Sequence, residues 1–424
     1  MDPVDVLSQP VKLPFSGKVV PNRFLKSAMT ERLCTWDPDN RAECGKPTEA
    51  YVNLYKKWGE GQTGMIVLGN VPVHREFLEA AGNAIIDKTN SWDAVEAFKP
   101  VVAAAKAHGM LVIAQLTHAG RQTAAHISEH PVSASATKTP DGAMGMTFKT
   151  ARAMTEEEIW DAIDRWAFAS EVLYKAGADG VQLHGAHGYL LSQFLSPRTN
   201  LRTDQWGGSF ENRSRIVFET LKAIRKRVPD EAFILSIKIN SHDFIDGGFD
   251  EQDCTAMVER LEAARVDLIE LSGGTYETSA FEHKKESTIR REGFFVEFAD
   301  RMRPHLKQSV LCVTGGFRNV GPMADAITRN TCQIIGLGRP LCAEPDLPKK
   351  ILERQVTGAK ENVLPFQLQI VAAVLQIHAI AENASVYDVS TKEGADEIGD
   401  ILQGKKASPR PESAKYPLVG SGRS

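Results

Sequence analysis

The chain alternates short apolar runs with longer amphipathic segments, and this alternation restricts its fold more than any other feature. Each run has the length of a strand, is apolar at consecutive positions and contains β-branched residues. This pattern is typical of a parallel sheet that is covered on both faces. The eight runs begin at Leu25, Gly64, Met110, Asp179, Phe233, Asp267, Ser309 and Gln333.

Segments with helical spacing follow these runs. The segment TEEEIWDAIDRWAFASEVLYKAG, after the third run, opens with Thr155 and Glu158 in capping-box spacing and ends at Gly177. Eight strands that are each followed by a helix predict an α/β fold, a single (β/α)8 TIM barrel. We expect a small N-terminal hairpin in PFSGKVVPNRF to close the floor of the barrel.

Two of the connections between strand and helix are long. They follow the third and fourth strands, over residues 117–154 and 184–212, and loops of this kind build active sites and lids at the C-terminal face of a barrel. We predict that the barrel spans residues 10–360. Residues 361–424 are predicted to form a C-terminal extension with a helix and a loose tail.

Charge and cysteine usage exclude several classes of protein. The net charge is -4 and the basic residues are scattered, which argues against a nucleic acid or a membrane as partner. The six cysteines include no C-x-x-C pair, so a zinc ribbon, an iron–sulfur cluster and a disulfide framework are disfavoured. The N-terminus does not have the pattern of a signal peptide. We expect a soluble cytoplasmic protein with a small-molecule substrate; whether it assembles as a homo-oligomer is left open.

Glycines stand at the ends of the last two predicted strands. Thr314, Gly315 and Gly316 end the seventh, and GLGR, with Gly338 and Arg339, ends the eighth. Loops after these two strands are the recurrent phosphate site of the barrel. Glycine lets backbone N–H groups approach a phosphate, and arginine can hold it with two hydrogen bonds. The alternative is that these glycines only make tight turns.

Three polar residues interrupt or end other predicted strands. Lys238 lies within FILSIKIN and Gln115 within VIAQLTHAGR, while Thr30 ends the first strand. A buried lysine requires an anion, which could instead be a core carboxylate such as Glu270. Together with a phosphate site, these residues suit a flat, phosphorylated, hydrogen-bonding cofactor such as flavin mononucleotide, FMN.

Two histidines and a tyrosine follow the fourth strand in VQLHGAHGYLLSQFLSP. His184 and His187 could be metal ligands, but no third ligand is obvious and the spacing is not that of H-E-x-x-H. They could also be structural. The reading that we favour is a pair of N–H donors aimed at one substrate oxygen, with the phenol of Tyr189 as a proton source.

These residues lie within a longer resemblance. The segment HGAHGYLLSQFLSPRTNLRTDQWGGSFENRSR resembles the Old Yellow Enzyme family of flavin-dependent ene-reductases and NAD(P)H:flavin oxidoreductases. KSAMT, QLTHAGRQ, SGGTYE, VTGGFRN and IGLGRPLCAEPDLP are similar to the family's other motifs and occur in the same order. The resemblance covers roughly residues 10–350.

The resemblance implies a role for each matching residue. The carbonyl clamp falls on His184 and His187, and the proton donor on Tyr189. By the same resemblance, Thr30 is expected to tune the flavin near its C4 carbonyl, and Gln115 to read the pyrimidine edge. The remaining flavin contacts fall on Ala28, Met29, Gly315, Gly316, Gly338 and Arg339. Tyr276 is a candidate lining residue of the substrate pocket.

The fifth strand departs from the family pattern. Lys238 stands where the family usually has an arginine near flavin N1. Lysine keeps the charge that stabilises reduced anionic flavin but lacks the planar guanidinium fork.

The resemblance implies an enzyme that uses FMN and NADPH or NADH to reduce the activated C=C bond of an enone or enal. An NAD(P)H oxidase or flavin reductase would use the same residues. A flavin-binding protein without turnover and a metal-dependent aldolase-type barrel are alternatives from other classes.

Overall fold

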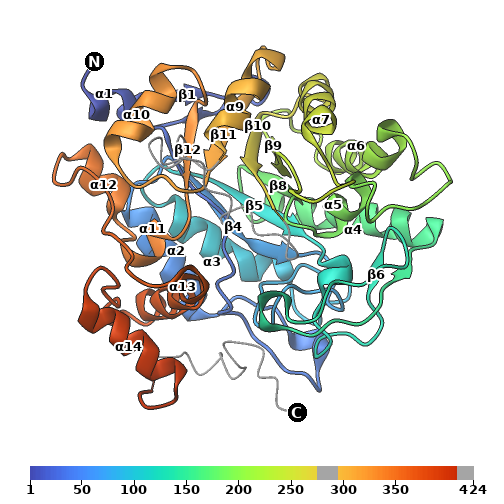
Figure 1. Cartoon of the computed structure of the whole chain (residues 1–424), viewed down its shortest axis with the longest axis horizontal. Helices are drawn as coiled ribbons and strands as arrows, with labels where there is room; N and C mark the ends of the chain where they lie inside the picture. Colours follow the sequence, from blue (N-terminus) through green and yellow to red (C-terminus); the bar gives the residue numbers. More distant parts are fainter. Residues whose placement is uncertain (275–294, 408–424) are drawn as a thin grey trace.

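The apolar runs form eight parallel strands that close on one another into a barrel (Figure 1). The computed structural model describes residues 1–274 and 295–407. The ring closes where β12 pairs with β3, with Ile335 opposite Phe24. The predicted (β/α)8 barrel is therefore confirmed. In chain order, its strands are β3 (Phe24–Lys26), β4 (Met65–Pro72), β5 (Leu111–Thr117), β8 (Gly180–Gly185), β9 (Ile234–Asn240), β10 (Leu268–Ser272), β11 (Val310–Thr314) and β12 (Ile334–Leu337).

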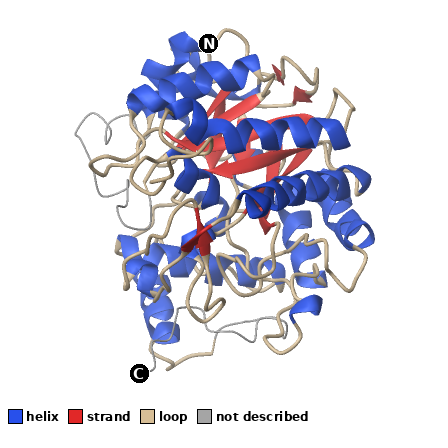
Figure 2. Cartoon of the chain, turned by 90° about the vertical axis from the view of Figure 1, so that its right-hand side faces the viewer, coloured by secondary structure: helices blue, strands red, loops and turns tan. Residues whose placement is uncertain are grey.

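Helices surround the strands, as the side view in Figure 2 shows. α4 begins with the predicted capping box, in which Thr155 and Glu158 bond each other's backbone N–H groups. The chain leaves this helix through Gly177, at a φ of 91°. The helices after the strands are α2 (Glu49–Glu60), α3 (Ala94–Lys106), α4 (Glu156–Lys175), α6 (Phe210–Arg227), α7 (Glu251–Ala263), α9 (Val296–Met302), α10 (Val320–Thr328), α11 (Pro340–Ala343) and α12 (Leu347–Leu352).

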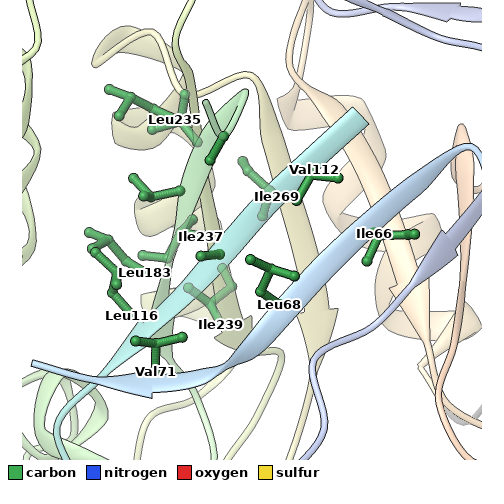
Figure 3. Packing of buried hydrophobic residues seen from close by; sticks show 14 of the residues in the cluster. Ile66, Leu68, Val71, Val112, Leu116, Leu183, Leu235, Ile237, Ile239 and Ile269 are labelled. Carbon is green, nitrogen blue, oxygen red and sulfur yellow. The ribbon is translucent and has the colours of Figure 1, made fainter. Parts of the chain in front are cut away.

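The main hydrophobic core lies between the barrel wall and these helices. Alternate residues of each strand, such as Leu183 of β8 and Ile237 and Ile239 of β9, belong to it (Figure 3). Because successive side chains of a strand point to opposite faces, the intervening residues point into the barrel. This arrangement explains why the strands are apolar on both faces.

The inside of the barrel changes from apolar to polar along the strands. Near the N-terminal ends, the inward residues form a separate apolar cluster that includes Met65, Ile113, Ile234 and Leu268. Two positions further along β5, the inward residue is Gln115; the corresponding residue of β10 is Glu270. The polar half of the interior therefore lies at the carboxyl ends of the strands, where barrel enzymes bind their ligands.

A hairpin closes the apolar end. β1 (Val11–Lys12) pairs antiparallel with β2 (Val19–Val20), and Leu13 packs on the inner apolar cluster. The carboxylate of Asp267 accepts hydrogen bonds from the backbone N–H groups of Phe15 and Ser16, both at 2.9 Å. The predicted floor hairpin is thus present and tied to the start of β10. A short helix, α1 (Pro3–Ser8), precedes it.

The long connections after β5 and β8 contain short elements of their own. The connection after β8 holds α5 (Leu190–Leu195). The connection after β5 contains η2 (Gly120–Gln122), β6 (Val132–Ser133), η3 (Ala143–Gly145) and β7 (Arg152–Ala153). Two further 3-10 turns lie elsewhere in the chain: η1 (Arg41–Glu43) between β3 and α2, and η5 (Arg303–His305) after α9.

The C-terminal extension contains two helices rather than the one expected. α13 (Phe366–Ala381) packs against α2 and α11, and the side-chain amide of Asn53 on α2 donates to the carbonyl oxygen of Ala381 at 2.7 Å. α14 (Lys392–Leu402) shares a small apolar cluster with α13 through Leu375 and Ile398. The extension therefore covers one side of the barrel. None of the helices in the described ranges is both long enough and apolar enough to cross a bilayer.

Candidate active site

The histidine cluster lies at the carboxyl end of β8, where the chain turns into α5. His184 belongs to β8 and is buried, and Tyr189 is the N-cap residue of α5 and also buried. The ring centroids of His184 and His187 are 5.2 Å apart, and those of His184 and Tyr189 are 4.5 Å apart. The three side chains that the sequence singled out are therefore neighbours in the fold.

Both imidazoles of the cluster are neutral. The backbone N–H of Ala186 donates to Nδ1 of His184 at 3.4 Å, so the ring proton of His184 lies on Nε2. Burial, with smaller contributions from His187 and Lys238, lowers the pKa of His184 well below its usual value. Burial and Lys238 lower the pKa of His187 to about 3. A neutral imidazole still donates its N–H, so the cluster offers donors without a positive charge.

His187 has a left-handed backbone conformation, with φ at 58°. Its backbone N–H donates to Oδ1 of Asn240 at 3.1 Å, and its carbonyl oxygen accepts from Nε2 of Gln122 at 3.0 Å. Its ring Nε2 lies 2.8 Å from Oγ of Ser272. These three supporting residues were missed from the sequence. Asn240 and Ser272 could have been noticed as the last, polar residues of two predicted strands.

A polar network crosses the inside of the barrel below the histidines. Nε2 of Gln115 donates to Oε1 of Gln182 at 2.7 Å, and Nε2 of Gln182 donates to Oε2 of Glu270 at 2.9 Å. Thr314 donates to Oε1 of Glu270 at 2.6 Å, and Lys238 forms an ion pair with the same oxygen at 3.1 Å. The pairing of Lys238 with Glu270, which the sequence left open, is therefore present, and Gln115 is joined to it through Gln182.

The loop after β3 lies at the barrel mouth, and Ala28, Met29 and Thr30 are half-buried there. The backbone N–H of Met29 donates to the carbonyl oxygen of Gly69 at 2.7 Å. The hydroxyl of Thr30 donates to Oε2 of Glu79 at 2.9 Å. Burial raises the pKa of Glu79. No sequence pattern pointed to Glu79, which lies outside the predicted strands and their ends.

A buried ion pair supports this loop from behind. The ammonium of Lys26 is fully buried, 3.2 Å from Oε1 of Glu31 and 4.1 Å from the centroid of the Trp58 ring. The hydroxyl of Tyr55 donates to Glu31 at 2.6 Å and accepts from the backbone N–H of Gly69 at 2.8 Å. Since Gly69 also binds Met29, the network fixes the backbone that is predicted to contact the flavin ring.

The predicted phosphate residues gather at the ends of β11 and β12. Gly315 and Gly316 have φ values of 124° and 94°, which a side chain would strain, and a Cβ at Gly338 would meet no atom within 4 Å. Nη1 of Arg339 donates to Oε1 of Gln369 on α13 at 2.5 Å. Burial and the neighbouring Arg318 lower the pKa of Arg339. Two guanidinium groups beside glycine backbone suit a dianionic phosphate.

These features together fit FMN. The polar half of the barrel supplies an amide at Gln115 and an ammonium at Lys238, and the glycine-rich strand ends supply backbone and two arginines for a phosphate. Oγ1 of Thr117, two residues after Gln115 on β5, is buried and has no hydrogen-bond partner among residues 1–274 and 295–407. A buried orphan hydroxyl at this place is what a bound polar molecule would satisfy.

Tyr276, the candidate lining residue of the substrate pocket, lies outside the described residues. Within the described ranges, no group of three or more His, Cys, Asp or Glu side chains could hold a metal ion.

Comparisons with known proteins find flavin oxidoreductases among the relatives of this chain. The chain matches the model of the NADH:flavin oxidoreductase / NADH oxidase family over residues 7–358. It is 39% identical over 426 residues to the NADH-dependent flavin oxidoreductase nadA of Aspergillus parasiticus, covering 98% of this chain and 95% of that protein. It is 34% identical to the NADH-dependent flavin oxidoreductase iccE of Talaromyces variabilis, covering 79% and 84%. The solved structure of the old yellow enzyme homologue of Zymomonas mobilis matches with a TM-score of 0.69 and 25% identity, covering 84% and 94%.

Proposed function

The chain belongs to the NADH:flavin oxidoreductase / NADH oxidase family, the family of old yellow enzyme, and we propose that it reduces the activated C=C bond of α,β-unsaturated carbonyl compounds. It is an enzyme that uses FMN as cofactor and NAD(P)H as electron donor. The observation that carries the proposal is the pair of neutral imidazoles beside Tyr189, above the polar half of the barrel.

The imidazoles would bind the substrate's carbonyl oxygen. Negative charge develops on this oxygen when a nucleophile adds to the conjugated β-carbon, and two N–H donors in a site with little water stabilise that charge. His184 has its proton on Nε2, and His187 is fixed by Asn240, Gln122 and Ser272. The donors are therefore oriented before the substrate arrives, which lowers the reorganisation that the reaction requires.

Tyr189 would donate a proton to the α-carbon. The hydride that the β-carbon receives would come from bound FMN that NAD(P)H has reduced. The phenol is buried and packs edge-on against His184, so a carbonyl bound to the imidazoles would hold its α-carbon near Tyr189. A positioned general acid of this kind contributes roughly 100- to 10,000-fold to a rate.

The cofactor would be held along the polar half of the barrel. We assign the pyrimidine edge of the flavin to Gln115 and Lys238, and the ring contacts to Ala28, Met29 and Thr30. We assign the phosphate of the cofactor to Gly315, Gly316, Gly338 and Arg339. Because the Thr30 hydroxyl donates to Glu79, it would meet the flavin as an acceptor or exchange that bond on binding.

The test is an anaerobic absorbance experiment on the purified FMN-loaded protein. NADH or NADPH should bleach the flavin, and cyclohexenone should restore its colour. Flavin that stays bleached until oxygen enters would contradict enone reduction and favour the oxidase or flavin reductase activity that the family name includes. Flavin that NAD(P)H does not bleach would indicate a binding protein without turnover.

A second arm tests the proton donor. Tyr189→Phe should slow reoxidation by cyclohexenone at least about 100-fold and leave flavin reduction by NADH unchanged. Tyr174→Phe, which removes the hydroxyl of a surface tyrosine on α4, is the matched control and should change neither rate. Full enone turnover in Tyr189→Phe would mean that the α-carbon takes its proton from another source.

A further inference from the structure

The ion pair between Lys238 and Glu270 is built into the barrel wall. The two residues are register partners on the neighbouring strands β9 and β10, and both point inward. Their charged atoms are 3.1 Å apart, and the side chains are 6% and 0% exposed. Lys238 is also the register partner of His184, so the pair lies directly beside the clamp.

The carboxylate of Glu270 is fully engaged. Oε1 accepts from Thr314 and faces Lys238, and Oε2 accepts from Gln182. Burial alone would raise the pKa of Glu270, but Lys238 and the two donors outweigh it and lower the pKa below its usual value. Glu270 is therefore an anion, and with the ammonium of Lys238 it makes a unit of zero net charge inside the barrel.

This anion also sets the direction of the amide chain that ends at Gln115. A carboxylate can only accept, so Gln182 must direct its NH₂ group toward Glu270. Its carbonyl oxygen is then left to accept from Nε2 of Gln115. As a result, Gln115 keeps its own carbonyl oxygen and one N–H available. An acceptor paired with a donor complements the pyrimidine edge of a flavin, which presents an N–H between two carbonyl groups.

We propose that Glu270 is a positioning residue for FMN, one that fixes Lys238 and Gln115 against the cofactor. Glu270 also offsets the positive charge of Lys238 and thereby lowers the reduction potential of the flavin. This inference rests on one part of the proposed function, the assignment of Lys238 and Gln115 to the flavin. An uncompensated ammonium in the barrel would favour the reduced, anionic flavin, because charges interact strongly where water is excluded. Glu270 weakens that preference.

The experiment is a reduction-potential titration of the FMN-loaded protein against a reference dye, with no enone present. Glu270→Gln should raise the two-electron potential by at least about 30 mV, which is a tenfold change in the equilibrium constant. It should also weaken FMN binding, since a glutamine can reverse the direction of the amide chain. Asp267→Asn is the matched control: it removes another buried carboxylate, which lies just before the start of the same strand at the barrel floor, and should leave the potential unchanged.

A second pair of variants covers the case in which Glu270→Gln does not fold, because it leaves a buried ammonium without its partner. Lys238→Met should lower the potential, and the double variant Lys238→Met with Glu270→Gln should have a higher potential than Lys238→Met alone. The inference would be overturned if Lys238→Met had the same potential as the wild type and the double variant had the same potential as Lys238→Met. A wild-type protein that is reduced by NADH but not reoxidised by cyclohexenone would overturn the proposed function and leave the potential measurements interpretable.

Discussion

His187 adopts a left-handed backbone conformation, which is unfavourable for most residues other than glycine. Such a conformation costs about 1–2 kcal/mol in a residue other than glycine. Two hydrogen bonds offset that cost and fix the direction of the ring: the N–H of His187 donates to Asn240, and its carbonyl oxygen accepts from Gln122. The orientation of His187 therefore depends on side chains from β9 and η2.

The first prediction concerns Asn240. Asn240→Ala should reduce the rate of flavin reoxidation by cyclohexenone roughly 10- to 100-fold, because a small misplacement of a donor costs that much. Reoxidation by oxygen and FMN content should not change, since neither uses the clamp. Ser241→Ala, which alters the next buried residue, is the control. If oxygen reoxidation falls in parallel, Asn240 acts on the flavin or on the fold instead.

The second prediction concerns pH. Burial lowers the pKa of His187 to about 3 and that of His184 well below its usual value, so we expect neither ring to take up a proton between pH 5 and pH 8. The affinity of the oxidised enzyme for cyclohexenone, measured from the flavin spectrum, should therefore be constant over this range. A change in affinity centred near pH 6.5 would show that at least one imidazole of the clamp titrates as it does in water.

At the scale of elements, α13 lies beyond the family match and contacts Arg339. The family model ends at residue 358, and α13 begins at Phe366. The ring of Phe366 lies 5.1 Å from the guanidinium of Arg339, and Gln369 accepts a hydrogen bond from the same group. The helix thus holds the arginine that is assigned to the phosphate.

The third prediction follows from this contact. Gln369→Ala should raise the dissociation constant of FMN about 10-fold, which corresponds to the loss of one hydrogen bond to a charged group. Gln367→Ala, an exposed position on the same helix, should not change it. Fluorescence titration of the FMN-free protein measures both. Equal affinities in the two variants would mean that α13 has no part in holding the cofactor.

At the scale of the whole molecule, the interior of the barrel changes from apolar at one end to polar at the other. The floor hairpin and the inner apolar cluster stabilise one end, and the polar network occupies the other. Closure occurs between β12 and β3, where Gly336 leaves room for the hydroxyls of Thr314 and Ser27 to bond each other at 2.8 Å. A Cβ at Gly336 would lie 1.7 Å from Oγ1 of Thr314.

The fourth prediction tests this closure. Gly336→Ala should destabilise the FMN-free protein by about 1–3 kcal/mol, as overpacking of a filled interior does. It should also displace Thr314 from Glu270. Gly338→Ala, at a position with open space around its Cβ, should leave stability unchanged. Urea denaturation of both variants provides the comparison, and equal midpoints would mean that the barrel absorbs the extra methyl group by local movement.

Much of the architecture was predictable because it depends on local pattern. Runs that are apolar at consecutive positions specify strands buried on both faces, and Thr155 with Glu158 specifies the start of a helix. The cluster of His184, His187 and Tyr189 was predictable for the same reason, since the three residues lie within one turn of chain at a strand end. The sequence by itself therefore determined the barrel, its floor and the position of the clamp.

Only the tertiary structure decided how those residues are held. The choice between a flavin contact and a core carboxylate for Lys238 depends on the register of β9 against β10, which brings Glu270 beside it. The supports of His187, and the contact of Gln369 with Arg339, join segments far apart in the chain. Side chains of separate strands and helices meet only after the barrel closes, because hydrophobic patterning specifies which face is buried but not which polar neighbour a buried group will find.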